Sequence, residues 1–187
     1  MKRVCLTGAE STGKSTLAPR LAALLGGVVV EEYGRLYAEA HGTDFTRDDL
    51  RRIAAGHIAA RRAVEAGAPR LIVEDTDIVV TCAWAEILFG EADPLLEAIP
   101  ATADLYLLFS PDVPWVDDGT RMFGSAERRA RFHALIAAGL ERRGIAAVAI
   151  GGDWEQRFAG SAAAVTAMPG MAGSHATIPL PPADSPM

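Results

Sequence analysis

The segment Gly8-Ala9-Glu10-Ser11-Thr12-Gly13-Lys14-Ser15 combines two glycines, a lysine and a hydroxyl in the pattern G-x₄-G-K-S. The glycines let the backbone curl until its N–H groups point inward, and a helix that begins at Lys14 adds free N–H donors and a partial positive charge. A loop of this kind binds an anionic triphosphate. The sequence therefore predicts a phosphate-binding loop, called the P-loop below.

Each side chain of the P-loop has an expected role in binding ATP and Mg²⁺, the two predicted cofactors. Lys14 is expected on the β- and γ-phosphates as a binding and catalytic residue, and the Ser15 hydroxyl as a Mg²⁺ ligand. Thr16 is expected to donate to the α-phosphate. Only Lys2 and Lys14 occur as lysines, so a lysine at this position is not background. The other predicted ATP contacts come from Gly8, Ser11, Thr12 and Gly13.

Two acidic clusters follow apolar runs that are typical of strands. They are Glu31-Glu32 and Glu74-Asp75-x-Asp77. Ligands of open parallel sheets bind beyond the carboxyl ends of the strands, so both clusters are expected near the P-loop. We interpret Glu31 and Glu74 as surface caps.

Phosphoryl transfer to an alcohol needs one carboxylate near the attacking hydroxyl and a second acidic group near the hydrated Mg²⁺. Asp75 follows its strand as a Walker B aspartate does, so we assign it a catalytic role at Mg²⁺ or its water shell. Glu32 is the preferred base or ligand of the substrate hydroxyl, and Asp77 is its rival. The alternative is that Asp75 or Asp77 caps the next helix.

Residues 111–132 begin with a polar, proline-rich stretch past the fourth expected strand, and we predict that they form a lid. Closure of a lid over ATP excludes water and limits wasteful hydrolysis. Arg121 is a predicted catalytic residue and Arg128 a predicted ATP ligand, because both could place charge on the transferring phosphoryl group. The alternative is that at least two of Arg128, Arg129 and Arg131 lie on a solvated helix face.

Aromatic residues supply candidate stacking surfaces for a substrate. Tyr33, Trp84 and Trp115 are predicted substrate-binding residues, and Tyr37 is a further candidate. A cationic aromatic substrate would favour such surfaces beside acidic groups. Core packing is the alternative for Trp84, and we interpret Trp154 and Tyr106 as structural.

Strand-like and helix-like segments alternate along residues 1–167 and must position these groups. The strands are continuous apolar runs, which is how strands buried on both faces appear. The pattern predicts an α/β fold, a P-loop NTPase three-layer αβα sandwich around a five-stranded parallel sheet with right-handed crossovers. The expected strands are Arg3–Thr7, Val28–Glu32, Arg70–Asp75, Asp104–Phe109 and Ile145–Ile150. The expected helices are Lys14–Leu25, Arg35–His41, Asp48–Ala66, Ile78–Phe89, Ser125–Arg143 and Asp153–Thr166.

Composition narrows the class of protein. The 187 residues fit one domain, half of them are hydrophobic, and the formal net charge is −6. An acidic chain without a ~20-residue apolar run is expected to bind neither nucleic acid nor membrane, and to be cytoplasmic. Cys5 and Cys82 are expected as buried free thiols. Residues 168–187, rich in proline and small residues, are expected to form a disordered or loosely packed tail.

Four motifs together resemble the ribosylnicotinamide kinase domain of the bacterial NadR proteins. The likeness covers roughly residues 1–155, and the four motifs occur in the same order. It implies transfer of phosphate from ATP to the 5′-hydroxyl of nicotinamide riboside, giving nicotinamide mononucleotide. It also implies that aromatic side chains hold the ring while acidic and arginine groups hold the ribose. The motifs are residues 8–17, Glu-Tyr-Gly-Arg at 32–35, Asp-Thr-Asp at 75–77 and Pro-Trp-Val-Asp-Asp-Gly-Thr-Arg at 114–121. By motif position the expected substrate contacts are Tyr33, Arg35, Asp77, Trp115, Asp118 and Arg121.

Two other functions stay open at the level of sequence. One is another nucleoside or nucleoside-monophosphate kinase, and the other is a P-loop ATPase that acts as a regulatory switch. Against the switch, the chain lacks the Asn/Thr-Lys-x-Asp motif that reads guanine. The expected partner is a small-molecule acceptor, and a homo-oligomer remains open.

Overall fold

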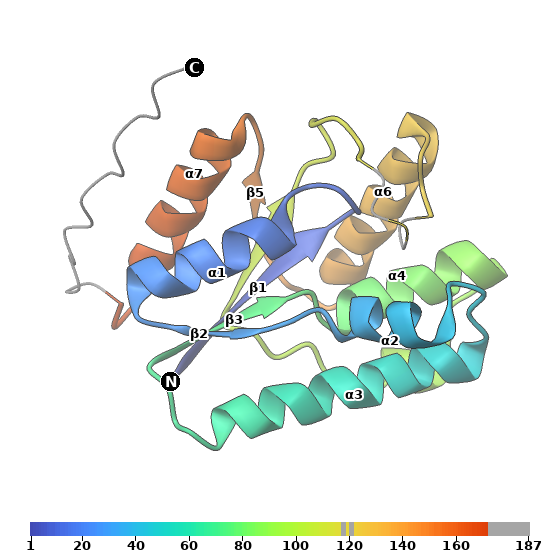
Figure 1. Ribbon diagram of the computed structural model, residues 1–187, viewed down its shortest axis with the longest axis horizontal. Coiled ribbons are helices and arrows are strands. Elements are labelled where there is room, and N and C mark those ends of the chain that lie inside the picture. The colour runs from blue at the N-terminus through green and yellow to red at the C-terminus, as the bar shows by residue number, and fades with distance from the viewer. Residues whose placement is uncertain (117–118, 120–121, 172–187) are drawn as a thin grey trace.

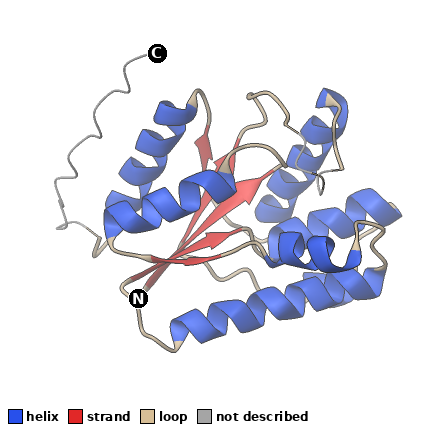
Figure 2. Cartoon of the chain, viewed as in Figure 1, coloured by secondary structure: helices blue, strands red, loops and turns tan. Residues whose placement is uncertain are grey.

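One parallel sheet of five strands, in the order β2-β3-β1-β4-β5, organises the protein (Figure 2). The computed structural model describes residues 1–116, 119 and 122–171. The predicted parallel five-stranded sheet is confirmed. The strands are β1 (Lys2–Gly8), β2 (Val28–Val30), β3 (Leu71–Asp75), β4 (Leu105–Phe109) and β5 (Ala147–Ile150). The helices are α1 (Lys14–Leu25), α2 (Tyr33–His41), α3 (Arg47–Glu65), α4 (Ile78–Phe89), α5 (Pro94–Glu97), α6 (Ala126–Arg142) and α7 (Trp154–Thr166).

Helices cover both faces of the sheet, which makes the three layers (Figure 1). Val4 and Leu6 of β1 belong to a core shared with α1 and α7. Cys5, between them, belongs to the opposite core with α3, α4 and α6. Successive side chains of a strand point to opposite faces, so a strand with a core on each side must be apolar throughout.

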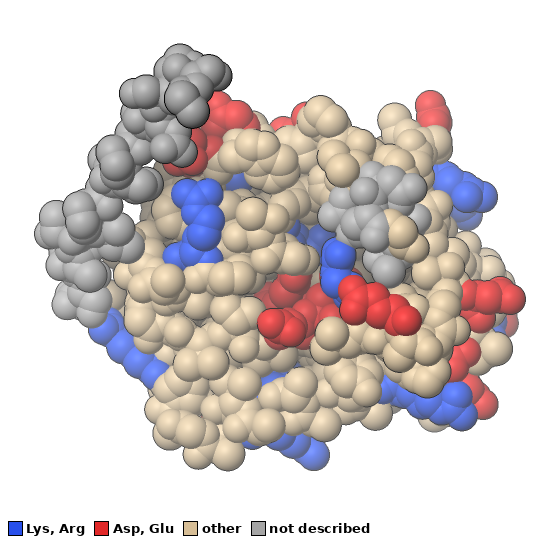
Figure 3. Space-filling model, viewed as in Figure 1, with Lys and Arg blue, Asp and Glu red and all other residues tan. Residues whose placement is uncertain are grey.

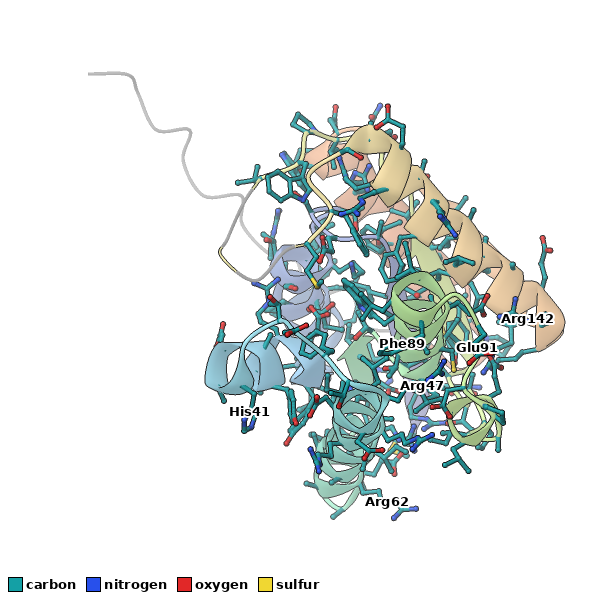
Figure 4. All side chains as sticks on the ribbon, turned by 90° about the vertical axis from the view of Figure 1, so that its right-hand side faces the viewer. His41, Arg47, Arg62, Phe89, Glu91 and Arg142 are labelled. Carbon is teal, nitrogen blue, oxygen red and sulfur yellow. The ribbon has the colours of Figure 1, made fainter. Side chains whose placement is uncertain are left out.

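The ends of α3 and α4 are joined by a small cluster of polar and aromatic contacts. Arg47, at the start of α3, places its guanidinium 4.6 Å from the Phe89 ring centroid and 2.7 Å from a Glu91 carboxylate oxygen (Figure 4). At the start of α3, Thr46 and Asp49 form a reciprocal capping box. Capping satisfies N–H groups that lack partners within the helix. The contacts of Arg47 therefore join the start of α3 to the end of α4.

Several element boundaries differ from the expected ones. The second strand was expected to run to Glu32, but β2 ends at Val30 and the next helix begins at Tyr33 rather than Arg35. Glu32 is the N-cap of that helix rather than the last residue of the strand. The short helix α5 was not predicted. It spans four residues, and Asp93 caps it by accepting from two backbone N–H groups.

The packed structure extends slightly beyond the expected domain boundary. Met168 and Met171 are 8 % and 5 % exposed and belong to the core shared with α1 and α7, although the tail was expected to begin at residue 168. Residues 172–187 lie outside the described part of the chain. Cys5 and Cys82 are buried free thiols, as predicted. Among the described helices, none is both long and apolar enough to cross a membrane.

Candidate functional site: a phosphate loop and its adjoining cleft

The P-loop adopts the curled backbone that its glycines predict. Gly8 and Gly13 have φ values of +137° and +88°, which side chains other than glycine rarely adopt. A Cβ atom on Gly8 would also come within 2.6 Å of the Phe109 carbonyl oxygen. Gly13 is the N-cap of α1, so the free N–H groups of that helix face the loop. The loop therefore needs glycine at both positions, for conformation and for space.

Lys14 holds its charge inside the loop. The residue is 7 % exposed, and its Nζ atom donates to the carbonyl oxygens of Gly8 and Ala9 at 3.0 and 2.8 Å. An ammonium held by carbonyl dipoles in a concave, partly desolvated site interacts strongly with an anion. Lys14 is thus positioned to bind phosphate within the curl of the backbone.

Arg157 of α7 fastens the P-loop to the sheet, a role that the sequence did not reveal. Its fully buried guanidinium donates to the carbonyl oxygens of Gly152, Thr12 and Ser110 at 2.8, 3.3 and 3.1 Å. It also pairs with Asp112. These contacts join the loop to the segments that follow β4 and β5. A single arginine in a helix carries no sequence signal for such a role.

Glu10 and Ser11 link the P-loop to the lid segment. The Glu10 carboxylate accepts from the backbone N–H groups of Met122 at 3.1 Å and Phe123 at 3.0 Å. The Ser11 hydroxyl oxygen accepts from the N–H of Val116 at 2.9 Å. Residue 10 occupies a variable position of the P-loop pattern, so this contact could not be predicted from the motif.

A cleft opens from the P-loop and is lined by residues of α2, α3, α4 and α6. It brings together four of the residues predicted at the site, Glu32, Arg35, Asp77 and Trp84, with the loop itself. Apolar and aromatic side chains form its far end. The lining residues outside the P-loop include Gly34, Ala38, Phe45, Leu50, Ile53, His57, Thr76, Val80, Thr81, Met122 and Phe132.

Stacked rings form one wall of the cleft. Trp84 lies nearly parallel to Phe123, with ring centroids 4.8 Å apart and an interplanar angle of 20°. Phe132 lies 4.7 Å from Trp84 on a tilted plane. Because Phe123 is held by Glu10, the aromatic wall and the P-loop are connected through one carboxylate.

Ser15 and Asp75 are suited to hold Mg²⁺ beside a bound triphosphate. Asp75 is 3 % exposed, and its Oδ1 atom has no hydrogen-bond partner among the described residues. Burial raises the pKa of Asp75, while the charge of Lys14 and a hydrogen bond from Ser15 oppose that rise. Nowhere in residues 1–116, 119 and 122–171 do three His, Cys, Asp or Glu residues gather as a metal site. The Ser15 hydroxyl and the Asp75 carboxylate nevertheless fit Mg²⁺, which is usually held by phosphates and water with one or two protein oxygens.

The pKa of the Glu32 carboxyl is raised by its surroundings. Burial, followed by the charge of Asp75, raises its pKa from 4.5 to about 7. The charges of Lys14 and then Arg35 oppose this rise in pKa, and Arg35 Nε lies 3.9 Å from Glu32 Oε2. A base is most effective when its pKa lies near the working pH. Acidic side chains also gather near the middle of the face in Figure 3.

Asp77 lies in the cleft wall but is engaged by the fold. Its Oδ1 atom accepts from the N–H of Val79 at 2.9 Å, which caps α4, and its Oδ2 atom accepts from the Tyr106 hydroxyl at 2.7 Å. Burial raises the pKa of Asp77, opposed by these two hydrogen bonds. The alternative interpretation of Asp77 as a helix cap is therefore correct, whatever further role it has.

Glu74 is not the surface cap that the sequence suggested. It is 1 % exposed, and its Oε2 atom lies 3.3 Å from Nε2 of the buried His57 on α3. His57 lines the cleft and was not predicted at the site.

Other predicted site residues lie away from the cleft or outside the described residues. The Tyr33 ring packs over Gly56 of α3, which leaves no space there for a Cβ atom. The Trp115 ring lies beside Gly124, and neither it nor Tyr33 lines the cleft. Arg128 is exposed, and its N–H donates to the Ser125 cap. Asp118 and Arg121 lie outside the described residues.

Comparison with known proteins adds a family and a set of relatives. Residues 3–157 match the family model described as an AAA domain. The chain is 33 % identical over 165 residues to the trifunctional NAD biosynthesis/regulator protein NadR of Escherichia coli (strain K12), and equally to that of Salmonella typhimurium. Each match covers 84 % of this chain and 40 % of the relative, so the chain spans about two fifths of their length.

Solved structures agree with these matches. A NadR protein in complex with NR is 30 % identical, with a TM-score of 0.77 over 88 % of this chain and 50 % of that chain. A NadR protein in complex with NAD and AMP-PNP is 28 % identical, with a TM-score of 0.74 over 88 % of this chain and 48 % of the other. Thymidylate kinase from Candida albicans is 14 % identical, with a TM-score of 0.64 over 88 % of this chain and 90 % of that chain, and supports the fold alone. The predicted P-loop NTPase fold is confirmed.

Proposed function

The chain belongs to the AAA domain family, and on that premise we propose that it is an ATP-dependent small-molecule kinase whose acceptor is nicotinamide riboside. The product would be nicotinamide mononucleotide, phosphorylated at the 5′-oxygen, within the biosynthesis of NAD. One observation carries the proposal. The P-loop, with the Lys14 ammonium inside it, opens directly onto a cleft lined by Glu32 and Trp84.

The proposed chemistry follows from what each side chain can do. Lys14 and the N–H groups at the start of α1 bind the triphosphate and stabilise the charge on the transferring phosphoryl group. Ser15 and Asp75 would hold Mg²⁺, which would supply positive charge to offset that of the phosphates. Glu32 lies in the adjoining cleft, where it accepts the proton of the attacking hydroxyl. The acceptor's hydroxyl oxygen then forms a bond to the γ-phosphorus of ATP, and ADP leaves.

The shape and charge of the cleft support a nucleoside with a cationic aromatic ring. Phe45, Trp84 and Phe132 contribute aromatic side chains to the lining, while Glu32 and Asp77 add negative charge. A cation is attracted both to the faces of aromatic rings and to carboxylates. The similarity to a NadR structure that contains NR supports the same choice of acceptor.

An acceptor panel tests this proposal. Purified protein with ATP and Mg²⁺ is offered nicotinamide riboside, thymidine, thymidylate, shikimate and gluconate, and ADP release is coupled to NADH oxidation. Turnover is expected with nicotinamide riboside well above the ATPase rate without acceptor. The Lys14→Met variant, which keeps the length of the side chain but removes its charge, is the control and should lose about 10²- to 10³-fold in kcat. Preference for another acceptor would contradict the proposed substrate.

A further inference from the structure

Trp154 is a large aromatic residue in an unusual place. It is the first residue of α7, and 49 % of it is exposed. Its ring nevertheless lies directly against the P-loop, because a Cβ atom on Gly13 would come 2.2 Å from its Cζ3 atom. An exposed tryptophan is not unusual by itself. An exposed tryptophan whose ring packs on the P-loop is, however, within reach of a ligand that the loop binds.

The indole lies on the side of the P-loop away from the acceptor cleft. The cleft is lined mainly by α2, α3 and α4, which follow or precede β2 and β3, and by Phe132 of α6, which packs with α3 and α4 on the sheet face opposite α1 and α7. Trp154 follows β5, at the other edge of the sheet, and α7 runs beside α1 (Figure 1). Arg20 of α1 contacts α7: its Nη2 atom lies 3.7 Å from Glu155 Oε1, and its Cζ atom lies 4.4 Å from the ring centroid of Phe158. The P-loop therefore separates the acceptor cleft from Trp154.

Phosphoryl transfer places the attacking and leaving oxygens roughly in line, on opposite sides of the transferring group. With the acceptor in the cleft, the rest of the donor nucleotide must lead away from it, toward α1 and α7. Trp154 offers a flat apolar surface there, and stacking on an aromatic side chain is how proteins commonly hold a base. We propose that Trp154 is a binding residue for the purine base of the donor nucleotide; this rests on the proposed use of ATP.

The surroundings of Trp154 hold it in place for this role. Asp153 and Gln156 form a capping box that fixes the start of α7. Arg157 anchors the same turn to Gly152 and to Thr12 of the P-loop. A side chain that is already ordered loses little conformational freedom when a ligand binds. Gly13, without a side chain, leaves the space that the ring occupies.

Two ligands separate base binding from support of the loop. ATP and inorganic tripolyphosphate, each with Mg²⁺, are titrated into wild type and Trp154→Ala by calorimetry, without any acceptor. Trp154→Ala is expected to weaken ATP about tenfold, and to change tripolyphosphate affinity less than twofold. Trp154→Phe, which keeps an aromatic face, should restore most of the ATP affinity. Leu95→Ala removes an exposed apolar side chain of α5 and is the matched control.

Three results would overturn the inference. Equal weakening of both ligands by Trp154→Ala would make Trp154 a support of the P-loop. Unchanged affinity for both would mean that the base does not contact it. Failure of Trp154→Phe to restore ATP binding while Trp154→Ala remains folded would exclude stacking. Wild type that binds neither ligand would instead refute the proposed kinase function.

Discussion

The Tyr106 hydroxyl donates a 2.7 Å hydrogen bond to Asp77, across from β4 to the start of α4. The other carboxylate oxygen of Asp77 accepts from Val79, and the residue is 6 % exposed. Both oxygens therefore stabilise the fold beneath the cleft. This arrangement favours Glu32 over Asp77 as the general base.

Replacing Asp77 is expected to affect stability strongly. Asp77→Ala removes a helix cap, worth about 0.5–2 kcal/mol, and leaves the buried Tyr106 hydroxyl without an acceptor, which costs about 1–3 kcal/mol. Asp77→Asn keeps one oxygen that can accept from the Val79 N–H and gains an amide N–H that can donate to the Tyr106 hydroxyl, so its loss of stability should be smaller. Urea denaturation measures the free energy of unfolding, and the Asp77→Ala/Tyr106→Phe pair should recover part of the loss. A folded Asp77→Ala protein with wild-type stability would disprove this role.

Replacing Glu32 is expected to affect catalysis. Glu32→Gln should lower kcat about 10²- to 10⁴-fold, because an amide cannot accept the proton of the attacking hydroxyl. ATP affinity should change little. The matched control is Glu31→Gln, an adjacent exposed carboxylate, with activity within about twofold of wild type. Loss of activity in Asp77→Asn but not in Glu32→Gln would exchange the two assignments.

The raised pKa of Glu32 also predicts how the stability of the ligand-free protein depends on pH. Its pKa is about 7 when folded against 4.5 ordinarily, so the folded state retains the proton longer. The contribution of protonated Glu32 to the free energy of unfolding is fully present below pH 4.5 and is lost as the pH rises to about 7. Glu32→Gln removes this loss. The melting temperature of Glu32→Gln, relative to that of wild type, should rise between pH 4.5 and 7, and the difference should stay constant above pH 7. A constant difference between pH 4.5 and 7 would contradict the shifted pKa.

Glu10 is expected to support the aromatic wall of the cleft. Glu10→Ala removes the acceptor for the N–H groups of Met122 and Phe123, and Phe123 stacks on Trp84. We expect kcat/KM for the acceptor to fall about tenfold, from the loss of hydrogen bonds to a charged group. More ADP should form per phosphorylated product, because the lid segment excludes water less well. Unchanged kinetics in Glu10→Ala would show that this contact has no functional role.

The sequence predicts most of the fold because its signals are local. Continuous apolar runs give buried parallel strands, and glycines at positions 8 and 13 give the P-loop. The boundary at Glu32 was wrong because a strand end and a helix cap differ only in backbone angles at one residue. Helix α5 was missed because four residues are too short to show periodicity.

The site was only partly predictable because several of its contacts join distant parts of the chain. Glu32 and Asp77 were found from their places after strands, Arg35 from a motif and Trp84 as an aromatic residue. All four line one cleft. Arg157, Glu10 and the His57–Glu74 pair depend on tertiary contacts that no spacing reveals. Tyr33 packs between helices instead, because Gly56 of α3 has no side chain and leaves space for its ring.

The central claim is tested most directly by identifying the phosphorylated product of a reaction with ATP, Mg²⁺ and nicotinamide riboside. Phosphorus NMR and mass spectrometry would follow the γ-phosphate. The account predicts one nicotinamide mononucleotide, with phosphate on the 5′-oxygen, for each ADP formed, and almost none with Lys14→Met. ADP and free phosphate without phosphorylated riboside, or phosphate on another oxygen, would contradict it.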